Sequence, residues 1–93
     1  SQPLRQADAG SETTAFAATA DTARYAFGNA AGEVLLVNPL DGAILQRTRI
    51  APVTAPVRVR ALAWSADGKR LAIAAQDGKP RIWNLADPQP TLL

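Results

Sequence analysis

The sequence predicts an all-β protein made of two four-stranded antiparallel units. Three observations support this: a gapless repeat at an offset of 46 positions, apolar residues that alternate with a period of two, and turn residues at matched places in both units. The offset places Asp21 over Asp67 and Gly32 over Gly78, and large apolar residues fall on apolar residues. Because repeats of this length mark repeat architectures, both copies are expected to form the same supersecondary unit.

The strands are expected where apolar and small residues alternate between turn signals. The first unit has such stretches at residues 13–19, 23–29, 32–38 and 43–50, and the second at 61–64, 69–75, 79–85 and, for a strand that has just begun, 91–93. The Asp-Gly pairs favour tight turns, because Asp bonds to the local backbone and Gly tolerates positive φ. A helix over the Ala-rich segment 15–27 is the one competing interpretation.

The composition bounds the function classes. Ninety-three residues with 47% apolar character suffice for one folded domain, but two Trp, one Tyr and two Phe are few large side chains for its core. The absence of Cys and His excludes disulfides and Ser-His, Cys-His and His-metal chemistry. A net charge of +2 gives weak support for nucleic acid, and neither a membrane span nor a signal peptide is visible. A chain that starts at Ser1 and lacks Met is interpreted as a processed or excised piece.

Residues 59–85 resemble a WD repeat of the β-propeller family. The matching elements are Ser65 with Asp67-Gly68, the loop pair Asp77-Gly78, and Trp83, which Asn84 follows where the family has Asp. The first unit is similar but degenerate, with Val37, Ala31 and Thr22 in place of the Trp, the loop Asp and the turn Gly. The family's network of His, Ser or Thr, Asp and Trp cannot form in full without His, so we expect blades held mainly by apolar packing.

The resemblance implies four-stranded propeller blades, two per chain: residues 13–50 form blade 1, and residues 51–93 form blade 2 with an incomplete fourth strand. Residues 1–12 are expected to complete a neighbouring blade. Two blades leave two apolar faces open, whereas propellers close rings of roughly four to eight blades. We therefore expect the ring to be completed by oligomerisation, as a trimer or tetramer of the chain, or by a partner chain that holds the remaining blades.

Several residue groups are candidates for sites, and each has a structural alternative. The segment 47–60 carries Arg47, Arg49, Arg58 and Arg60 and no acid, which predicts a basic channel mouth or, the favoured interpretation, solvated strand edges. Paired carboxylates for glycoside hydrolysis are disfavoured, because the aspartates fall at turn positions. The aromatic residues are expected in the core: Trp64, Trp83, Tyr25 and Phe27.

The leading functional hypothesis is a non-catalytic module for protein interaction and assembly, with no cofactor, no metal and no nucleic-acid or membrane partner. The resemblance implies that the binding surface lies at the mouth of the propeller channel. Carried onto this chain, that surface comprises Asn29, Glu33, Arg58, Arg60, Gln76, Asp77 and Lys79. The alternatives are a fragment whose only partner is the rest of its own propeller and, less favoured, a carbohydrate-binding propeller.

Overall fold

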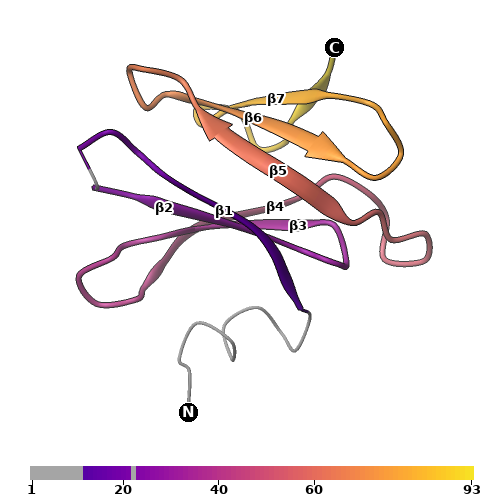
Figure 1. The fold of residues 1–93 in the computed structure, drawn as a ribbon, viewed down its shortest axis with the longest axis horizontal. Coiled ribbons are helices and arrows are strands. Elements are labelled where there is room, and N and C mark those ends of the chain that lie inside the picture. The colour runs from indigo at the N-terminus through magenta and orange to yellow at the C-terminus, as the bar shows by residue number, and fades with distance from the viewer. Residues whose placement is uncertain (1–11, 22) are drawn as a thin grey trace.

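The computed structural model describes residues 12–21 and 23–93, which form two β-sheets (Figure 1). The first sheet contains β1 (Thr13–Ala18), β2 (Tyr25–Asn29), β3 (Glu33–Val37) and β4 (Ile44–Arg49). The second contains β5 (Val59–Trp64), β6 (Arg70–Ala75), β7 (Arg81–Asn84) and β8 (Thr91–Leu92). Each sheet is an antiparallel meander in which neighbouring strands follow one another along the chain.

The turn between β2 and β3 is specified by an Asn and a Gly. The Asn29 side-chain oxygen accepts hydrogen bonds from the backbone N–H groups of Ala31 at 3.0 Å and Glu33 at 2.9 Å. Gly32 has a φ of 87°, and a Cβ on it would lie 2.8 Å from the Val57 carbonyl oxygen. Both the left-handed conformation and the close approach of backbone therefore require Gly at this position.

The turns before β2 and before β6 share one hydrogen-bond pattern. Ser65 donates to the Asp67 carboxylate at 2.6 Å and accepts from the Arg70 N–H at 3.0 Å. Thr19 donates to Asp21 at 2.7 Å in the first sheet. The hydrogen bonds lower the pKa of both carboxyl groups: those from Ser65 and the Lys69 N–H for Asp67, and those from the Ala23 N–H and Thr19 for Asp21. The aspartates are turn residues, as the sequence predicts.

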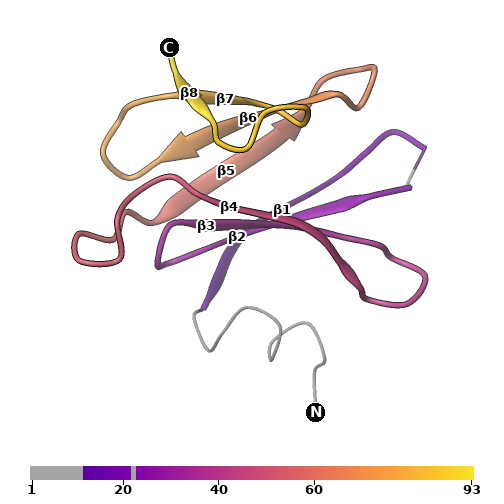
Figure 2. The same cartoon turned by 180° about the vertical axis from the view of Figure 1, so that it is seen from behind.

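The two sheets pack face to face, with β5 against β1 and β2. Figure 2 shows from behind that the β4–β5 connection lies at one end of both sheets. The core between the sheets is apolar: Ala26, Val34, Leu36, Val59, Leu71, Ile73 and Trp83. Gly28 allows the closest approach, because a Cβ there would lie 2.7 Å from the Val59 Cβ. Val59 of the second sheet thus packs directly against the backbone of Gly28 in the first.

Polar groups also link the two sheets. The Thr14 hydroxyl donates to the Val59 carbonyl at 2.6 Å. Side chains of β4 reach the connection between β7 and β8, where the Gln46 amide donates to the Leu85 carbonyl at 3.1 Å. The interface therefore combines apolar packing with hydrogen bonds that fix how the sheets sit on one another.

The predicted fold class is confirmed: the described residues form two four-stranded antiparallel sheets and no helix. The competing helix over residues 15–27 is wrong, since this segment forms most of β1 and β2. Its alternating apolar residues pair across the hairpin, as Phe16 does with Phe27. The expected strand or connection at residues 1–12 falls, apart from Glu12, outside the described residues.

Candidate interaction surfaces

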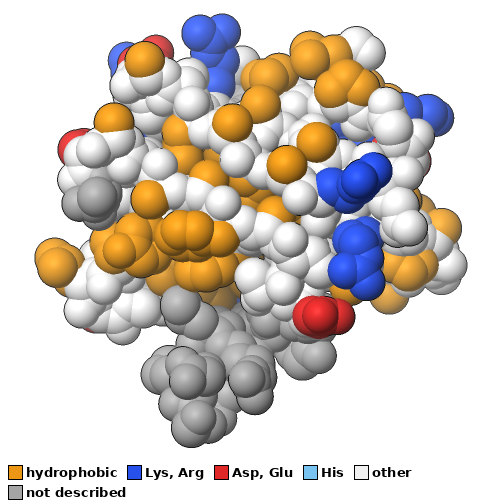
Figure 3. Space-filling model, viewed as in Figure 1, with side chains coloured by type: hydrophobic (Ala, Val, Ile, Leu, Met, Phe, Trp, Pro, Cys, Tyr) orange, Lys and Arg blue, Asp and Glu red, His pale blue; other side chains and the backbone are white. Residues whose placement is uncertain are grey.

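Five of the seven predicted partner-binding residues lie together where β5 begins. The Gln76 N–H donates to the Arg58 carbonyl at 2.9 Å, which joins the approach to β5 with the β6–β7 turn. Arg58, Arg60, Gln76 and Lys79 are exposed. Figure 3 shows basic side chains gathered near the start of β5. The arrangement is an exposed, mainly basic rim at one end of the second sheet.

The fifth residue, Asp77, is bound within the turn. Its two carboxylate oxygens accept from the Arg81 guanidinium at 2.9 and 3.2 Å, and one also accepts from the Lys79 N–H at 3.0 Å. The hydrogen bonds from Arg81, followed by that from Lys79, lower the pKa of Asp77 to about 2. Arg81 is buried at 8% exposure. Asp77 is therefore the counter-ion of a buried cation, a role that the sequence analysis did not assign to it.

Asn29 and Glu33, the other two predicted residues, are buried in the first sheet. The Asn29 amide donates to Glu33 at 3.1 Å, and the Arg49 guanidinium pairs with the other Glu33 oxygen at 3.0 Å. Arg49 also reaches the carbonyls of Ala31 and Ala51, both at 3.4 Å. The three side chains form a polar network that ties β2, β3 and β4 together. The available sequence signal was the opposite charges of Glu33 and Arg49 on two consecutive strands of the predicted meander, and the structure makes these two residues register partners.

The first sheet carries an aromatic face on the side away from the second sheet. Phe16, Tyr25 and Phe27 form a three-ring cluster there, with ring centroids 5.1 to 6.4 Å apart. Phe16 is 53% exposed. The sequence predicts Tyr25 and Phe27 in the core, but both are only half-buried on this face. The buried side chains of Leu35 and Val37 belong to the same face by register.

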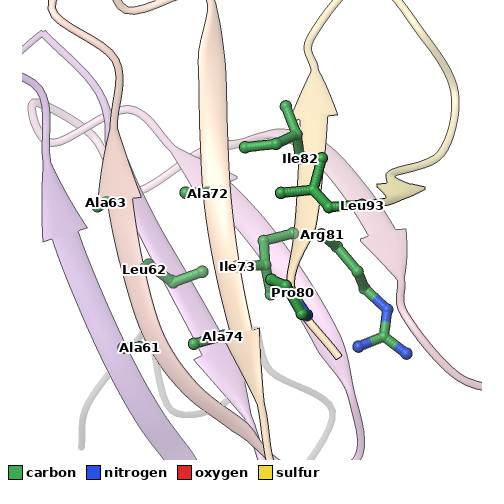
Figure 4. A pocket seen from close by; sticks show the side chains of 10 residues that line it. All are labelled: Ala61, Leu62, Ala63, Ala72, Ile73, Ala74, Pro80, Arg81, Ile82 and Leu93. Atoms are coloured by element: carbon green, nitrogen blue, oxygen red, sulfur yellow. The ribbon is translucent and has the colours of Figure 1, made fainter. Parts of the chain in front are cut away.

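The second sheet carries an alanine face on its outer side. It consists of Ala61, Ala63, Ala72, Ala74 and Ile82, which share one side of β5, β6 and β7 by register. A hollow of about 190 Å³ lies over this face and extends to Pro80 and Leu93 (Figure 4). The sequence analysis missed this face, because it followed the large side chains of these strands and assigned no role to the small ones between them.

Trp83 and Trp64 occupy different environments. Trp83 is 1% exposed in the core, and its indole N–H donates to the Asp87 carbonyl at 3.0 Å. Trp64 is half-buried between the sheets, where its N–H donates to the Ala17 carbonyl at 3.2 Å. The predicted core role is thus met fully by Trp83, while Trp64 serves the contact between the sheets.

Among the described residues no three acidic, His or Cys side chains come together as a metal site. The same residues include no helix long and apolar enough to cross a membrane. What the described surface offers is two open apolar faces and a basic rim.

Comparison with solved structures places this fold among β-propellers. The "Myceliophteria thermophila Cps50 (Swd1) beta-propeller domain" matches with a TM-score of 0.69 and 26% identity over 94% of this chain and 29% of that chain. Hsv2 of "Kluyvelomyces marxianus" matches with a TM-score of 0.74 and 14% identity over 82% and 25% of the two chains. U3-55K matches with a TM-score of 0.73 and 21% identity over 87% and 25%. The chain thus spans between a quarter and three tenths of each of these structures.

Sequence comparison identifies the family. No curated protein sequence matches the chain significantly. The family model described as the Anaphase-promoting complex subunit 4 WD40 domain matches residues 25–90, which is more than half of the chain and reaches from β2 to the end of the β7–β8 connection. On this match and on its two four-stranded antiparallel sheets, the chain belongs to the WD40 β-propeller family.

Proposed function

We propose that these two blades are a non-catalytic part of a WD40 propeller that serves as a scaffold for protein assembly. The observation that carries the proposal is the pair of open apolar faces, one aromatic and one alanine-lined, on opposite sides of the two blades. Apolar surface of this kind marks sites where another protein element binds. The WD40 family membership supports the same role, since the family consists typically of interaction scaffolds.

The two open faces repeat the two halves of the interface that already joins the blades. At the 46-residue offset, Ala72 and Ala74 of the alanine face correspond to Ala26 and Gly28, which are buried against the second sheet. Phe27 of the aromatic face corresponds in the same way to Ile73, which is 1% exposed. We infer that the next blade on either side covers these faces, supplied by further propeller blades or by other copies of the chain.

The basic rim at the start of β5 is the proposed contact for a protein partner. Arg58, Arg60, Gln76 and Lys79 are exposed and lie around one turn, and Arg is the cation best suited to bidentate contacts with carboxylates. The partner surface is therefore expected to be acidic. Asp77 holds the β6–β7 turn of this rim through its bonds to Arg81 and the Lys79 N–H, whereas Asn29 and Glu33 bond within the first blade.

Cysteine labelling tests the proposed blade contacts, because the chain has no Cys of its own. Ala74→Cys places a thiol on the alanine face, and Ala66→Cys places one on the exposed β5–β6 turn; both alanines are exposed in these two blades. In cells of the native host, we expect a membrane-permeable maleimide to label Ala74→Cys at least about tenfold more slowly than Ala66→Cys. Equal labelling would show that no blade covers this face and would contradict the scaffold proposal.

Charge reversal tests the basic rim separately. Arg58→Glu with Arg60→Glu should remove partner proteins that cross-link to the rim in the native host. The slow labelling of Ala74→Cys should persist in the same variant, because neither Arg lines the hollow over the alanine face. An unchanged set of cross-linked proteins would refute the assignment of the rim.

A further inference from the structure

Trp64 occupies a defined seat on the neighbouring blade. Its indole N–H donates to the Ala17 carbonyl at 3.2 Å, and the Arg24 guanidinium lies over its ring at 5.2 Å from the centroid. Trp64 packs against the core cluster, of which Ala26 and Leu36 are the members that lie in register beside Ala17. Arg24 also donates to the Gly68 carbonyl at 2.7 Å. The seat thus consists of a carbonyl acceptor, a cation and an apolar floor.

The second blade repeats this seat, and in these two blades it is empty. A groove of about 210 Å³ lies on the alanine face beside the β5–β6 turn. Four residues that line this groove are the counterparts, at the 46-residue offset, of residues in the seat of Trp64. Ala63 corresponds to Ala17, Arg70 to Arg24, Ala72 to Ala26, and Ile82 to Leu36. The strand pairing is the same in both blades, as Ala17 pairs with Ala26 and Ala63 with Ala72. The acceptor, the cation and the apolar floor are therefore all present.

Arg70 is available for this contact. It is exposed, whereas Arg24 is half-buried under the neighbouring blade. Within the described part of the chain, the Arg70 guanidinium makes no hydrogen bond or ion pair. A cation over an aromatic face is favourable when such a ring is supplied.

A second copy of this chain fits the groove poorly. Its first blade would present Ala18 where the seat calls for the indole of Trp64. It would also present Thr13 in the place of Val59, opposite Ala74 instead of Gly28. At Gly28 there is no room for a Cβ beside the β-branched Val59, since the two Cβ atoms would be 2.7 Å apart. Ala74 opposite Thr13 would therefore place a Cβ against a β-branched side chain, which is the clash that Gly28 avoids opposite Val59.

We propose that the groove at Arg70 receives a tryptophan from a further, non-identical propeller blade, and that this blade has a residue smaller than Val or Thr opposite Ala74. The inference rests on the proposed covering of the alanine face by another blade. It adds which kind of blade can cover that face. The indole N–H donates to the Ala63 carbonyl, and its ring lies under Arg70.

Self-association of engineered variants of this 93-residue chain tests the seat directly. Ala74→Gly restores the space found at Gly28, and Ala18→Trp gives the first blade the missing indole; Ala18 is exposed, so the substitution does not disturb the core. Sedimentation equilibrium over a range of concentrations compares A74G with A18W/A74G. Two further variants add either R70A or, as the matched control at the other end of the sheet, R58A.

We expect A18W/A74G to associate at least about tenfold more tightly than A74G, which corresponds to about 1.4 kcal/mol. R70A should cancel this gain, and R58A should leave it intact. Tight association of the wild-type chain that R70A does not weaken would overturn the proposal, because a second copy would then cover the face without an indole. Equal association of A18W/A74G and A74G would overturn it as well. The scaffold proposal fails separately, by fast labelling of Ala74→Cys in cells.

Discussion

Gly28→Ala probes the close packing between the blades with a single methyl group. Gly28 is buried in the middle of the β2 ladder, where it pairs with Val34. The added Cβ would lie 2.7 Å from the Val59 Cβ and 3.2 Å from one of its γ carbons. Val59 is fully buried and β-branched, so it has few rotamers with which to avoid the methyl group. The two blades must therefore move apart locally.

The expected cost follows from two opposing effects. Replacing Gly by Ala in an extended strand favours the folded state by roughly 0.5–1 kcal/mol. Overpacking of a well-packed core costs about 1–3 kcal/mol. The clash should win, because it involves a Cβ and not the far end of a flexible side chain. We expect a net loss of about 1–2 kcal/mol, and each kcal/mol lowers the melting temperature of a domain this size by about 4–8 °C.

Urea unfolding followed by Trp fluorescence measures this loss in the two-blade chain. Val59→Ala removes the two γ carbons that crowd the new methyl group and leaves only the Val59 Cβ against it, so part of the clash is relieved and the double variant G28A/V59A should be more stable than the sum of the single changes predicts. Ala74→Gly is the control at the corresponding position of the second blade, where the residue is exposed. A G28A chain as stable as wild type, or strictly additive effects of G28A and V59A, would refute the packing argument.

Two further predictions concern Trp83 and Asp77. Trp83→Ala should lower the free energy of unfolding by about 3–5 kcal/mol, because it empties the largest fully buried site and removes the bond to the Asp87 carbonyl; an unchanged urea midpoint would show that Trp83 is no core residue. Asp77→Asn keeps an acceptor for the Lys79 N–H but leaves Arg81 without its counter-ion. Since the pKa of Asp77 is about 2 in the fold and about 3.9 in an unfolded chain, the stability difference should be full above about pH 5 and be lost progressively as the pH falls through 2. A difference that does not change between pH 7 and pH 2 would contradict the role of the ion pair.

The strands and turns could be predicted because they depend on local chemistry. Asp67 and Gly68 form the same kind of turn whatever lies beyond it, since the Asp bonds to its own backbone and Gly takes the φ of 70°. The alternation in β6 likewise puts Leu71 and Ile73 on one side without reference to any partner. These are relations within a few residues of sequence, and the repeat gives the turn Asp and the alternation a second time, although Thr22 stands in place of the Gly.

Burial could not be predicted in the same way, because it depends on which neighbour covers a strand. Tyr25 and Leu71 occupy corresponding positions, yet Tyr25 is half-buried and Leu71 is fully buried. The first blade covers Leu71, and no described residue covers the face of Tyr25 to the same extent. The exposure of the candidate site residues could not be predicted for the same reason. Asn29 was expected to contact a partner protein, but it is bound to Glu33 in its own blade.

The differences between the two repeats are most informative where one blade meets the next. A repeat whose blades were interchangeable would keep the same residues at every contact, and any two blades could then pair. Here Gly28 has become Ala74, and Trp64 corresponds to Ala18, while the cation of the seat is present in both blades as Arg24 and Arg70. Changes that remove an attractive contact or add a methyl group at one interface discriminate between otherwise similar partners. Each blade face is thereby suited to one neighbour, which would fix the order of blades around a ring built from similar units.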